Sequence, residues 1–217
     1  MSVVKSRRES LINSLEDNSI AIFYSSKSPI KSGDERYPFS PNRNYLYFTN
    51  LAIEHSFLVL YKTDDEIFEK LFIERNDPVL ARWIGEKLSK EECSEKSDIN
   101  IENINYIDDF YSFLGNTLSK YYIDCVYLYL KNVDWENSAT EKQLAKEITK
   151  DFPYIKIKDI SKIVNNLRVI KDDTEIENIK KAIAITKEGI VFLIKNAKPG
   201  MYEYELEAYF DFILRKN

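Results

Sequence analysis

The 217-residue sequence contains little cysteine, histidine or glycine, and each shortage excludes a class of function. With only Cys93 and Cys125 it has no disulfide framework and no paired thiolate motif for a metal. His55 is the only histidine, so any imidazole base or metal ligand would have to be this residue. The five glycines are too scattered for a glycine-rich nucleotide loop. We therefore expect neither a thiolate metal site nor a phosphate-binding loop.

Long apolar runs and an excess of basic residues are also missing. The apolar run at 125–130 is far shorter than the roughly 20 residues that cross a bilayer. Basic residues at 5–8 resemble the start of a signal peptide, but polar residues within 9–17 interrupt the apolar segment that it would need. The net charge of −5 disfavours a nucleic-acid partner. These features predict a globular, cytoplasmic protein with no membrane or nucleic-acid partner.

The first third of the chain predicts a helix followed by strands. Leu11, Ile12 and Leu15 recur at helical spacing, and the compact apolar run 20–24 then predicts a buried strand. Three further segments rich in aromatic and β-branched residues predict strands that pair as sequential hairpins. They lie at residues 45–49, 56–61 and 67–73.

Helices and strands then alternate as far as residue 167. Asp77 before Pro78 is typical of a helix start, and Ser89 with Glu92 has the spacing of a capping box. The other expected elements are a helix at 108–121, a strand at 122–130, a helix at 139–149 and a strand at 154–157. This alternation predicts an α/β fold with a mixed sheet flanked by helices.

The pattern changes at a boundary between Arg168 and Asp173, which divides the chain into residues 1–167 and 168–217. Isoleucine and leucine residues mark one face of a much longer helix at 174–196, and a second apolar-faced helix follows at 202–215. No sheet comes after these two helices. We therefore expect residues 168–217 to be the beginning of an unfinished domain.

Acidic clusters could in principle hold a metal. They occur at residues 64–66, 91–92, 108–109, 172–173 and 203–207. Most are expected to be helix caps and solvated faces, because carboxylates before a helix complement its dipole. His55 is expected to be a hydrogen-bonded turn residue, Cys125 a core residue and Cys93 a partly exposed helix residue.

Two segments are richer in aromatic and charged residues than an ordinary loop needs, although either could simply pack beneath its loop. Residues 33–39 read Gly-Asp-Glu-Arg-Tyr-Pro-Phe, and residues 82–85 read Arg-Trp-Ile-Gly. With Asn-Tyr-Leu-Tyr-Phe-Thr at 44–49, Phe-Leu-Val-Leu at 57–60 and Arg-Asn-Asp-Pro at 75–78, they resemble the N-terminal domain of aminopeptidase P. These enzymes are the Xaa-Pro aminopeptidases of the creatinase and prolidase superfamily.

A second block resembles the junction and first two helices of that family's catalytic "pita-bread" domain. It comprises residues 167–171, Glu175, Ile176, Ala182 and residues 198–208. The resemblance implies a creatinase N-terminal-like domain at 1–167 and a truncated catalytic domain at 168–217. It also implies that the full-length protein removes the N-terminal residue from peptides with proline in second position.

The resemblance further implies two divalent metal ions, commonly manganese, held by two Asp, one His and two Glu. These ligands would follow residue 217, so this chain is expected to contain no catalytic or metal-binding residue and to be inactive alone. Asp34 and Trp83 match residues that, in some relatives, approach the substrate pocket of a neighbouring subunit in a homodimer or homotetramer. Ser40 and Asn50 depart from the family pattern, which usually has Arg and Thr-Gly there.

Two alternatives remain open at this point. The chain could be a non-enzymatic binding module, either a natural stand-alone domain or the front of a pseudoenzyme that has lost its metal ligands. Alternatively, a prolidase-like or creatinase-like enzyme would have the same fold and a different substrate.

Overall fold

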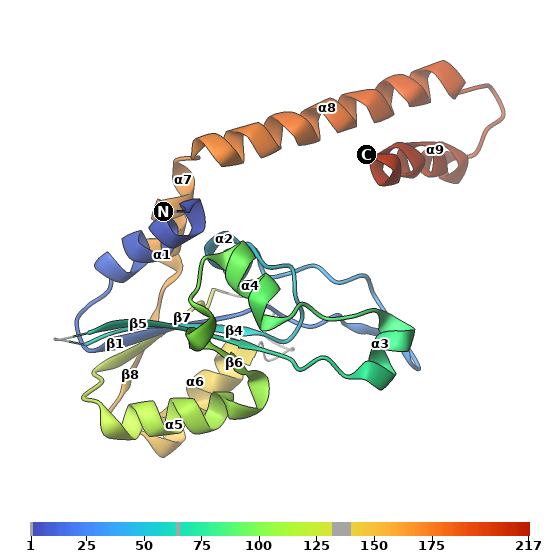
Figure 1. Ribbon diagram of the computed structural model, residues 1–217. Coiled ribbons are helices and arrows are strands. Elements are labelled where there is room, and N and C mark those ends of the chain that lie inside the picture. The colour runs from blue at the N-terminus through green and yellow to red at the C-terminus, as the bar shows by residue number, and fades with distance from the viewer. Residues whose placement is uncertain (1, 64–65, 132–139) are drawn as a thin grey trace. The chain divides into compact units, whose positions relative to one another are not determined.

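A computed structural model describes residues 2–63, 66–131 and 140–217 of the chain. The chain forms two compact units, Met1–Leu167 and Arg168–Asn217. The first unit has a sheet with helices on both faces (Figure 1). The predicted α/β class, with a mixed sheet flanked by helices, is therefore confirmed.

The sheet has six strands in the order β6-β5-β4-β1-β7-β8. Their bounds are β1 Ser19–Tyr24, β4 Phe57–Lys62, β5 Ile67–Ile73, β6 Ile104–Tyr106, β7 Cys125–Leu128 and β8 Lys156–Asp159. β4 is antiparallel to both β1 and β5, while the pairs β5–β6, β1–β7 and β7–β8 are parallel. β1 is therefore a central strand, and all six of its residues are buried.

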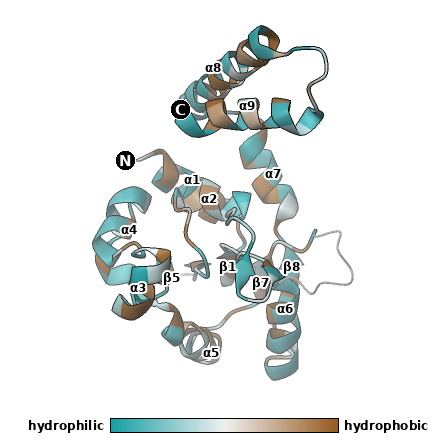
Figure 2. Ribbon diagram, turned by 90° about the vertical axis from the view of Figure 1, so that its right-hand side faces the viewer, coloured by the Kyte–Doolittle hydropathy of each residue, from teal (hydrophilic) through white to brown (hydrophobic). Residues whose placement is uncertain are grey.

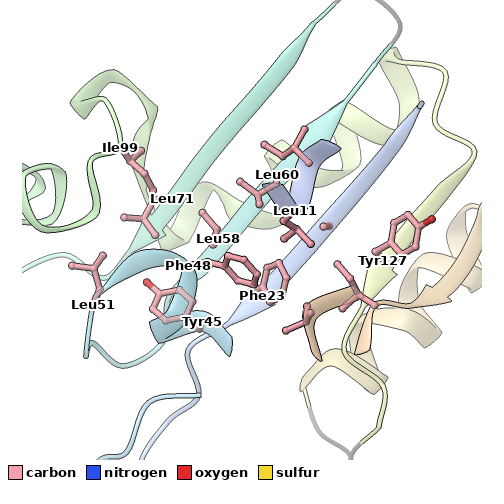
Figure 3. Close-up of a cluster of buried hydrophobic side chains, with 14 of the residues drawn as sticks. Leu11, Phe23, Tyr45, Phe48, Leu51, Leu58, Leu60, Leu71, Ile99 and Tyr127 are labelled. Carbon is pink, nitrogen blue, oxygen red and sulfur yellow. The ribbon is translucent and has the colours of Figure 1, made fainter. Parts of the chain in front are cut away.

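Each face of the sheet carries its own hydrophobic core. On one face lie α1 (Val3–Asn13), α2 (Arg43–Thr49) and α4 (Lys90–Ser97), and on the other lie α5 (Phe110–Lys120) and α6 (Thr140–Asp151) (Figure 1). Because side chains alternate along a strand, Ala21 and Phe23 of β1 join the first core and Ile20 and Ile22 the second. Figure 3 shows Phe23 beside Phe48 of α2, with ring centroids 4.9 Å apart.

Arg8 is buried in the first core although it is charged. Its Nε donates to Oε2 of Glu69 at 2.7 Å. Nη1 donates to the carbonyls of Phe48 (2.9 Å) and Ser97 (2.8 Å), and Nη2 to the carbonyl of Asp98 (3.1 Å). One side chain of α1 thus ties together α2, the end of α4 and strand β5.

The prediction of a strand at 45–49 is wrong, because this segment is helix α2. Asn42 caps it by accepting from the backbone N–H groups of Asn44 (2.9 Å) and Tyr45 (3.3 Å). Tyr45 and Phe48 are three residues apart and fully buried, which is the spacing of one helix face. The helix ends at Asn50, whose φ of 56° and ψ of 23° lie in the left-handed region. Aromatic residues in this segment suit a buried helix face as well as a strand.

Several other elements match their predicted type with shifted ends. The predicted short helices begin at Pro78 (α3, Pro78–Ile84) and Lys90 (α4). The strand predicted at 122–130 is only the four residues of β7, and that predicted at 154–157 begins later, as β8. Ala139, the predicted start of the helix at 139–149, lies outside the described residues.

Four groups of elements were not predicted from the sequence. The first is a hairpin of β2 (Ile30–Ser32) and β3 (Glu35–Arg36). The others are strand β6, the 3₁₀-helices η1 (Ile101–Asn103) and η2 (Ile107–Asp109) beside it, and α7 (Ser161–Val169). The strands and 3₁₀-helices have only two or three residues each, too few for a periodic pattern.

The second unit contains the helices α8 (Asp173–Asn196) and α9 (Glu203–Lys216). They pack closely where Gly189 meets the ring of Phe210, because a Cβ at this glycine would lie 2.5 Å from Cε2 of that ring. Hydrophobic and hydrophilic residues alternate along both helices (Figure 2). Within the described part of the chain, no helix has the length and apolar character needed to cross a membrane.

Candidate functional site

A hollow of about 470 Å³ lies in the first unit between the β2–β3 hairpin, the end of β5 and the segment after α3. Its apolar lining comes from Phe39, Ala52, Ile53, Ile73, Ile84, Gly85 and Leu88. Its charged lining comes from Arg36, Glu54, Glu74, Glu86 and Lys87. The two segments singled out in the sequence therefore border one hollow. Arg36 lines it from the segment that contains Asp34, and Ile84 lines it from the segment that contains Trp83.

Helix α3 forms because strong local signals enclose it. Oδ1 of Asp77 accepts from the backbone N–H groups of Val79 (2.8 Å) and Leu80 (3.3 Å), and Pro78 occupies the first helical position. Gly85 ends the helix with a φ of 84°, a conformation that favours glycine. The predicted start of this helix is confirmed.

No residue of α3 is buried, and Figure 1 shows the helix apart from the layers that cover the sheet. Trp83 is 85% exposed, and the neighbouring side chains of Val79, Leu80 and Ile84 are at least half exposed. A contiguous exposed patch of this kind is typical of an interaction surface. The alternative expectation, that Trp83 packs beneath its own loop, is wrong.

Asp34 lies in the two-residue turn, Gly33-Asp34, between β2 and β3, and its side chain is exposed. Gly33 has a φ of 55°, which a turn of this kind requires. Nη1 of Arg36 donates to the carbonyl of Ser28 at 2.9 Å, and Lys31 pairs with Glu35 at 2.7 Å. These contacts hold the hairpin that carries Asp34.

Glu74 joins three segments at the edge of the hollow. Its Oε1 lies 2.8 Å from Nδ1 of His55, and its Oε2 accepts from Nζ of Lys87 at 2.5 Å. Because an ionised carboxylate only accepts hydrogen bonds, Nδ1 of His55 carries the proton. Burial raises the pKa of Glu74, but the hydrogen bonds from Lys87 and His55 outweigh it and hold the pKa below its ordinary value. Glu74 is therefore a paired, ionised carboxylate.

His55 is a hydrogen-bonded turn residue, as expected. Its φ of 48° is left-handed, and its backbone N–H donates to the carbonyl of Ser26 at 2.9 Å. Nearby, the hydroxyl of Ser28 donates to Oε1 of Glu54. These contacts join the segment that follows β1 to the segment that precedes β4.

The charged groups of the hollow do not fit a divalent metal. Among the described residues, no three or more His, Cys, Asp or Glu side chains gather closely enough to hold one. Glu74 has Lys87 as its partner, and this cation would repel a metal ion. The two metal ions implied by the resemblance therefore have no ligand set in the described residues.

The other candidates from the sequence have structural contacts. Asp108 pairs with Arg75 at 3.1 Å, and Asp172 caps α8 by accepting from the N–H of Glu175 at 2.9 Å. Asp64 and Asp65 lie outside the described residues. Cys125 is buried, as expected.

The expectation that Cys93 is partly exposed is wrong. Its side chain is fully buried in the first core, and burial raises the pKa of its thiol to about 11. A thiol with such a pKa is protonated at neutral pH and unreactive.

A second hollow, of about 550 Å³, lies among α1, β5 and α4. Its most buried charged residue is Arg8, which is paired with Glu69 and three carbonyls. The hollow beside α3 is therefore the stronger candidate, because both predicted segments border it.

Sequence reasoning missed Glu74 and Lys87. A signal for them was present: Glu74 directly follows the apolar end of β5, and Lys87 directly precedes Leu88 and the capping box of α4. They therefore lie at the two ends of the segment 74–87, which connects β5 to α4 and contains α3.

Comparison with known proteins identifies the family of this chain. The family model described as "Aminopeptidase P, N-terminal domain" matches residues 4–127. A solved structure from Bacillus anthracis, assigned to aminopeptidase P, is 38% identical with a TM-score of 0.90, and the match covers 98% of this chain and 51% of that one. The low-pH form of Escherichia coli aminopeptidase P has the same fold, with a TM-score of 0.84 at 22% identity, over 98% of this chain and 49% of that one.

Sequence relatives agree with these structures. The Xaa-Pro aminopeptidase of E. coli K12 is 28% identical over 93% of this chain and 46% of its own length. The Haemophilus influenzae Xaa-Pro aminopeptidase is 24% identical over 93% of this chain and 44% of its own length. The chain thus spans about half the length of the relatives that it matches. Because the family model matches more than half of its residues, the chain belongs to the family of the aminopeptidase P N-terminal domain.

Proposed function

We propose that this chain supplies the N-terminal domain of an Xaa-Pro aminopeptidase, a metallopeptidase that removes the first residue from peptides with proline in second position. The observation that supports this most strongly is the family match over residues 4–127, together with relatives named Xaa-Pro aminopeptidase that align with 93% of the chain. Residues 1–167 are the accessory domain, and residues 168–217 begin the catalytic domain.

The metal centre, with two divalent ions such as manganese, belongs to the remainder of the longer protein. This assignment is consistent with the described residues, among which no three His, Cys, Asp or Glu side chains gather closely enough to hold a metal ion. We expect the chain on its own to bind no catalytic metal and to cleave no peptides.

The accessory domain covers the substrate pocket of a neighbouring subunit in a homo-oligomer, with Trp83 and Asp34 nearest to the peptide. Trp83 suits this role because it is 85% exposed and lies on α3, a helix with no buried residue. Tryptophan is among the residues that contribute most at protein interfaces. A covering domain would admit short peptides and exclude folded proteins, which is an effect of access and positioning.

The test is peptide hydrolysis by the full-length protein and its Trp83→Ala variant, using Xaa-Pro peptides and matched peptides without proline. We expect cleavage before proline only, and a loss of about 10-fold in kcat/KM for the variant, since removal of an interface tryptophan commonly costs this much. Tyr122→Ala is the control, because Tyr122 is another exposed aromatic residue, on a different part of the domain. It should leave kcat/KM unchanged.

The outcomes separate the two parts of the proposal. Absence of Xaa-Pro cleavage by the full-length protein with added divalent metal would overturn the assignment as a peptidase. Cleavage that is equally fast in wild type and Trp83→Ala would overturn only the covering role.

A further inference from the structure

The excursion from Glu74 to Lys87, here called the α3 arm, leaves the domain at the end of β5 and returns just before α4. Its helix α3 buries no residue, so packing does not fix the direction in which the helix points. The next residue, Leu88, packs against the first hydrophobic core. Whatever fixes the arm must therefore act at its base.

Contacts between the two ends of the arm close that base. Nζ of Lys87 donates to Oε2 of Glu74 at 2.5 Å, and the backbone N–H of Lys87 donates to Oδ1 of Asn76 at 3.4 Å. The first residues of the arm are thereby joined to its last residue.

His55 connects this base to the body of the domain. Its Nδ1 donates to Oε1 of Glu74 at 2.8 Å, while its backbone N–H donates to the carbonyl of Ser26 at 2.9 Å. His55 stands two residues before β4, a strand inside the sheet. One carboxylate oxygen of Glu74 is thus hydrogen-bonded to His55, beside the sheet, and the other to Lys87, at the returning end of the arm.

The three charged or polar side chains are partly shielded from solvent, with exposed fractions of 25% for Glu74, 28% for His55 and 35% for Lys87. Hydrogen bonds to ionised groups are stronger and shorter than those between neutral groups. Partial burial also reduces screening by salt. The contacts at Glu74 are therefore stronger than those of an ordinary surface pair.

We propose that Glu74 is a positioning residue, which together with His55 and Lys87 fixes the base of the α3 arm and so determines where Trp83 is presented. The inference rests on the covering role of Trp83 proposed above. Glu74 acts only through the arm and does not contact substrate. The proposed role concerns the direction of α3, and Glu74 takes no part in the chemistry of cleavage.

The length of the arm makes its base important. Seven helical residues span about 10 Å, so a small rotation at the base is a displacement of an ångström or more at the indole. Misplacement of a contacting group by about 1 Å can cost up to 100-fold in rate.

The first test measures hydrogen exchange of the α3 amides in the full-length protein. Glu74→Gln keeps the shape of the side chain and removes its charge, and Glu95→Gln makes the same change on the exposed face of α4. We expect exchange across residues 78–85 to rise about 10-fold in Glu74→Gln, the value of one charge-assisted hydrogen bond, with β4 and β5 unchanged. Exchange in α3 that matches the Glu95→Gln control would overturn the inference.

The second test is a double-mutant cycle in peptide cleavage. Glu74→Gln should lower kcat/KM about fivefold in wild type and have no effect in the Trp83→Ala background, because two residues that act through one another are not additive. Lys87→Met should behave like Glu74→Gln, whereas Lys87→Arg retains the cation and should restore most of the activity.

The two proposals fail in different ways. An equal loss from Glu74→Gln in both backgrounds would overturn the positioning role and leave the covering role of Trp83 intact. A Trp83→Ala variant with wild-type activity would overturn the covering role, and the positioning role with it.

Discussion

At the scale of single residues, Arg8 shows how a buried charge can hold a fold together. The guanidinium contacts Glu69 and three backbone carbonyls, so nearly all of its donors have partners inside the protein. Those carbonyls belong to Phe48, Ser97 and Asp98, at or beside the ends of α2 and α4. Carbonyls at helix ends have no partner within their own helix, and Arg8 supplies one.

Replacing Arg8 should therefore destabilise the first unit. Arg8→Met keeps the length of the side chain but leaves Glu69 and the carbonyls without their donor. We expect the free energy of unfolding to fall by about 3–5 kcal/mol, as when one member of a buried charged pair is removed. Urea denaturation followed by circular dichroism would measure this.

Lys146→Met, at an exposed position on α6, is the control and should change stability by less than about 0.5 kcal/mol. A fall of less than about 1 kcal/mol for Arg8→Met would show that water replaces the lost donors.

At the scale of elements, α2 illustrates how tertiary structure decides between two local patterns. Its sequence, Arg-Asn-Tyr-Leu-Tyr-Phe-Thr, is rich in residues that favour strands. Asn42 and Asn50, which cap the two ends, are the local signals for a helix. The φ of 56° at Asn50 lies in the left-handed region, which favours Gly and tolerates Asn.

This explanation predicts different results for two substitutions at Asn50. Asn50→Gly should leave the free energy of unfolding nearly unchanged, because glycine adopts a left-handed conformation without steric cost. Asn50→Ala should lower it by about 1 kcal/mol, because Cβ then approaches the following carbonyl. Urea midpoints at constant m-value compare the two, and equal losses would contradict the conformational argument.

Apart from α2, the elements with a strong local signal were predictable. Asp77, Pro78, Ser89 and Glu92 identify the starts of α3 and α4 without reference to any other part of the chain. Strands β1 and β4 are compact apolar runs, and β5 is rich in isoleucine and phenylalanine, so all three were predicted. β6 and the β2–β3 hairpin are too short to show a periodic pattern, and β6 forms only because β5 lies beside it.

The candidate site was predictable only in part for the same reason. The segments of Asp34 and Trp83 have distinctive composition, whereas the contact between Glu74 and Lys87 depends on the path of the chain between them. His55 was identified as a turn residue, but its partner Glu74 lies 19 positions away on the next strand's end. Such pairs become visible only when strands β4 and β5 are placed side by side.

At the scale of the whole molecule, the second unit exposes an unusual amount of apolar surface. Ile183, Ile190 and Ile194 share one face of α8, and Ile194 is 73% exposed. Phe212 of α9 is also exposed. Helices with wide apolar faces are stable in water mainly when another element covers those faces.

The isolated chain should consequently self-associate as its concentration rises. Ile194→Glu should reduce the association measured by sedimentation velocity, because a charge on the apolar face is costly to bury. Thr174→Glu adds the same charge at an exposed polar position on the opposite face of α8 and serves as the control. Association that is the same for both variants would show that another surface is responsible.

The order of strands in the sheet also determines when the domain can form during synthesis. β1 pairs with β4 and β5 follows at once, but its other neighbour, β7, begins about 100 residues after β1 ends. At ordinary rates of translation, one edge of β1 stays without its partner for about 5–20 s. An apolar strand with an open edge can pair with another chain. Nascent copies of this protein are therefore most prone to aggregate in that interval, and slower translation before residue 125 would prolong it.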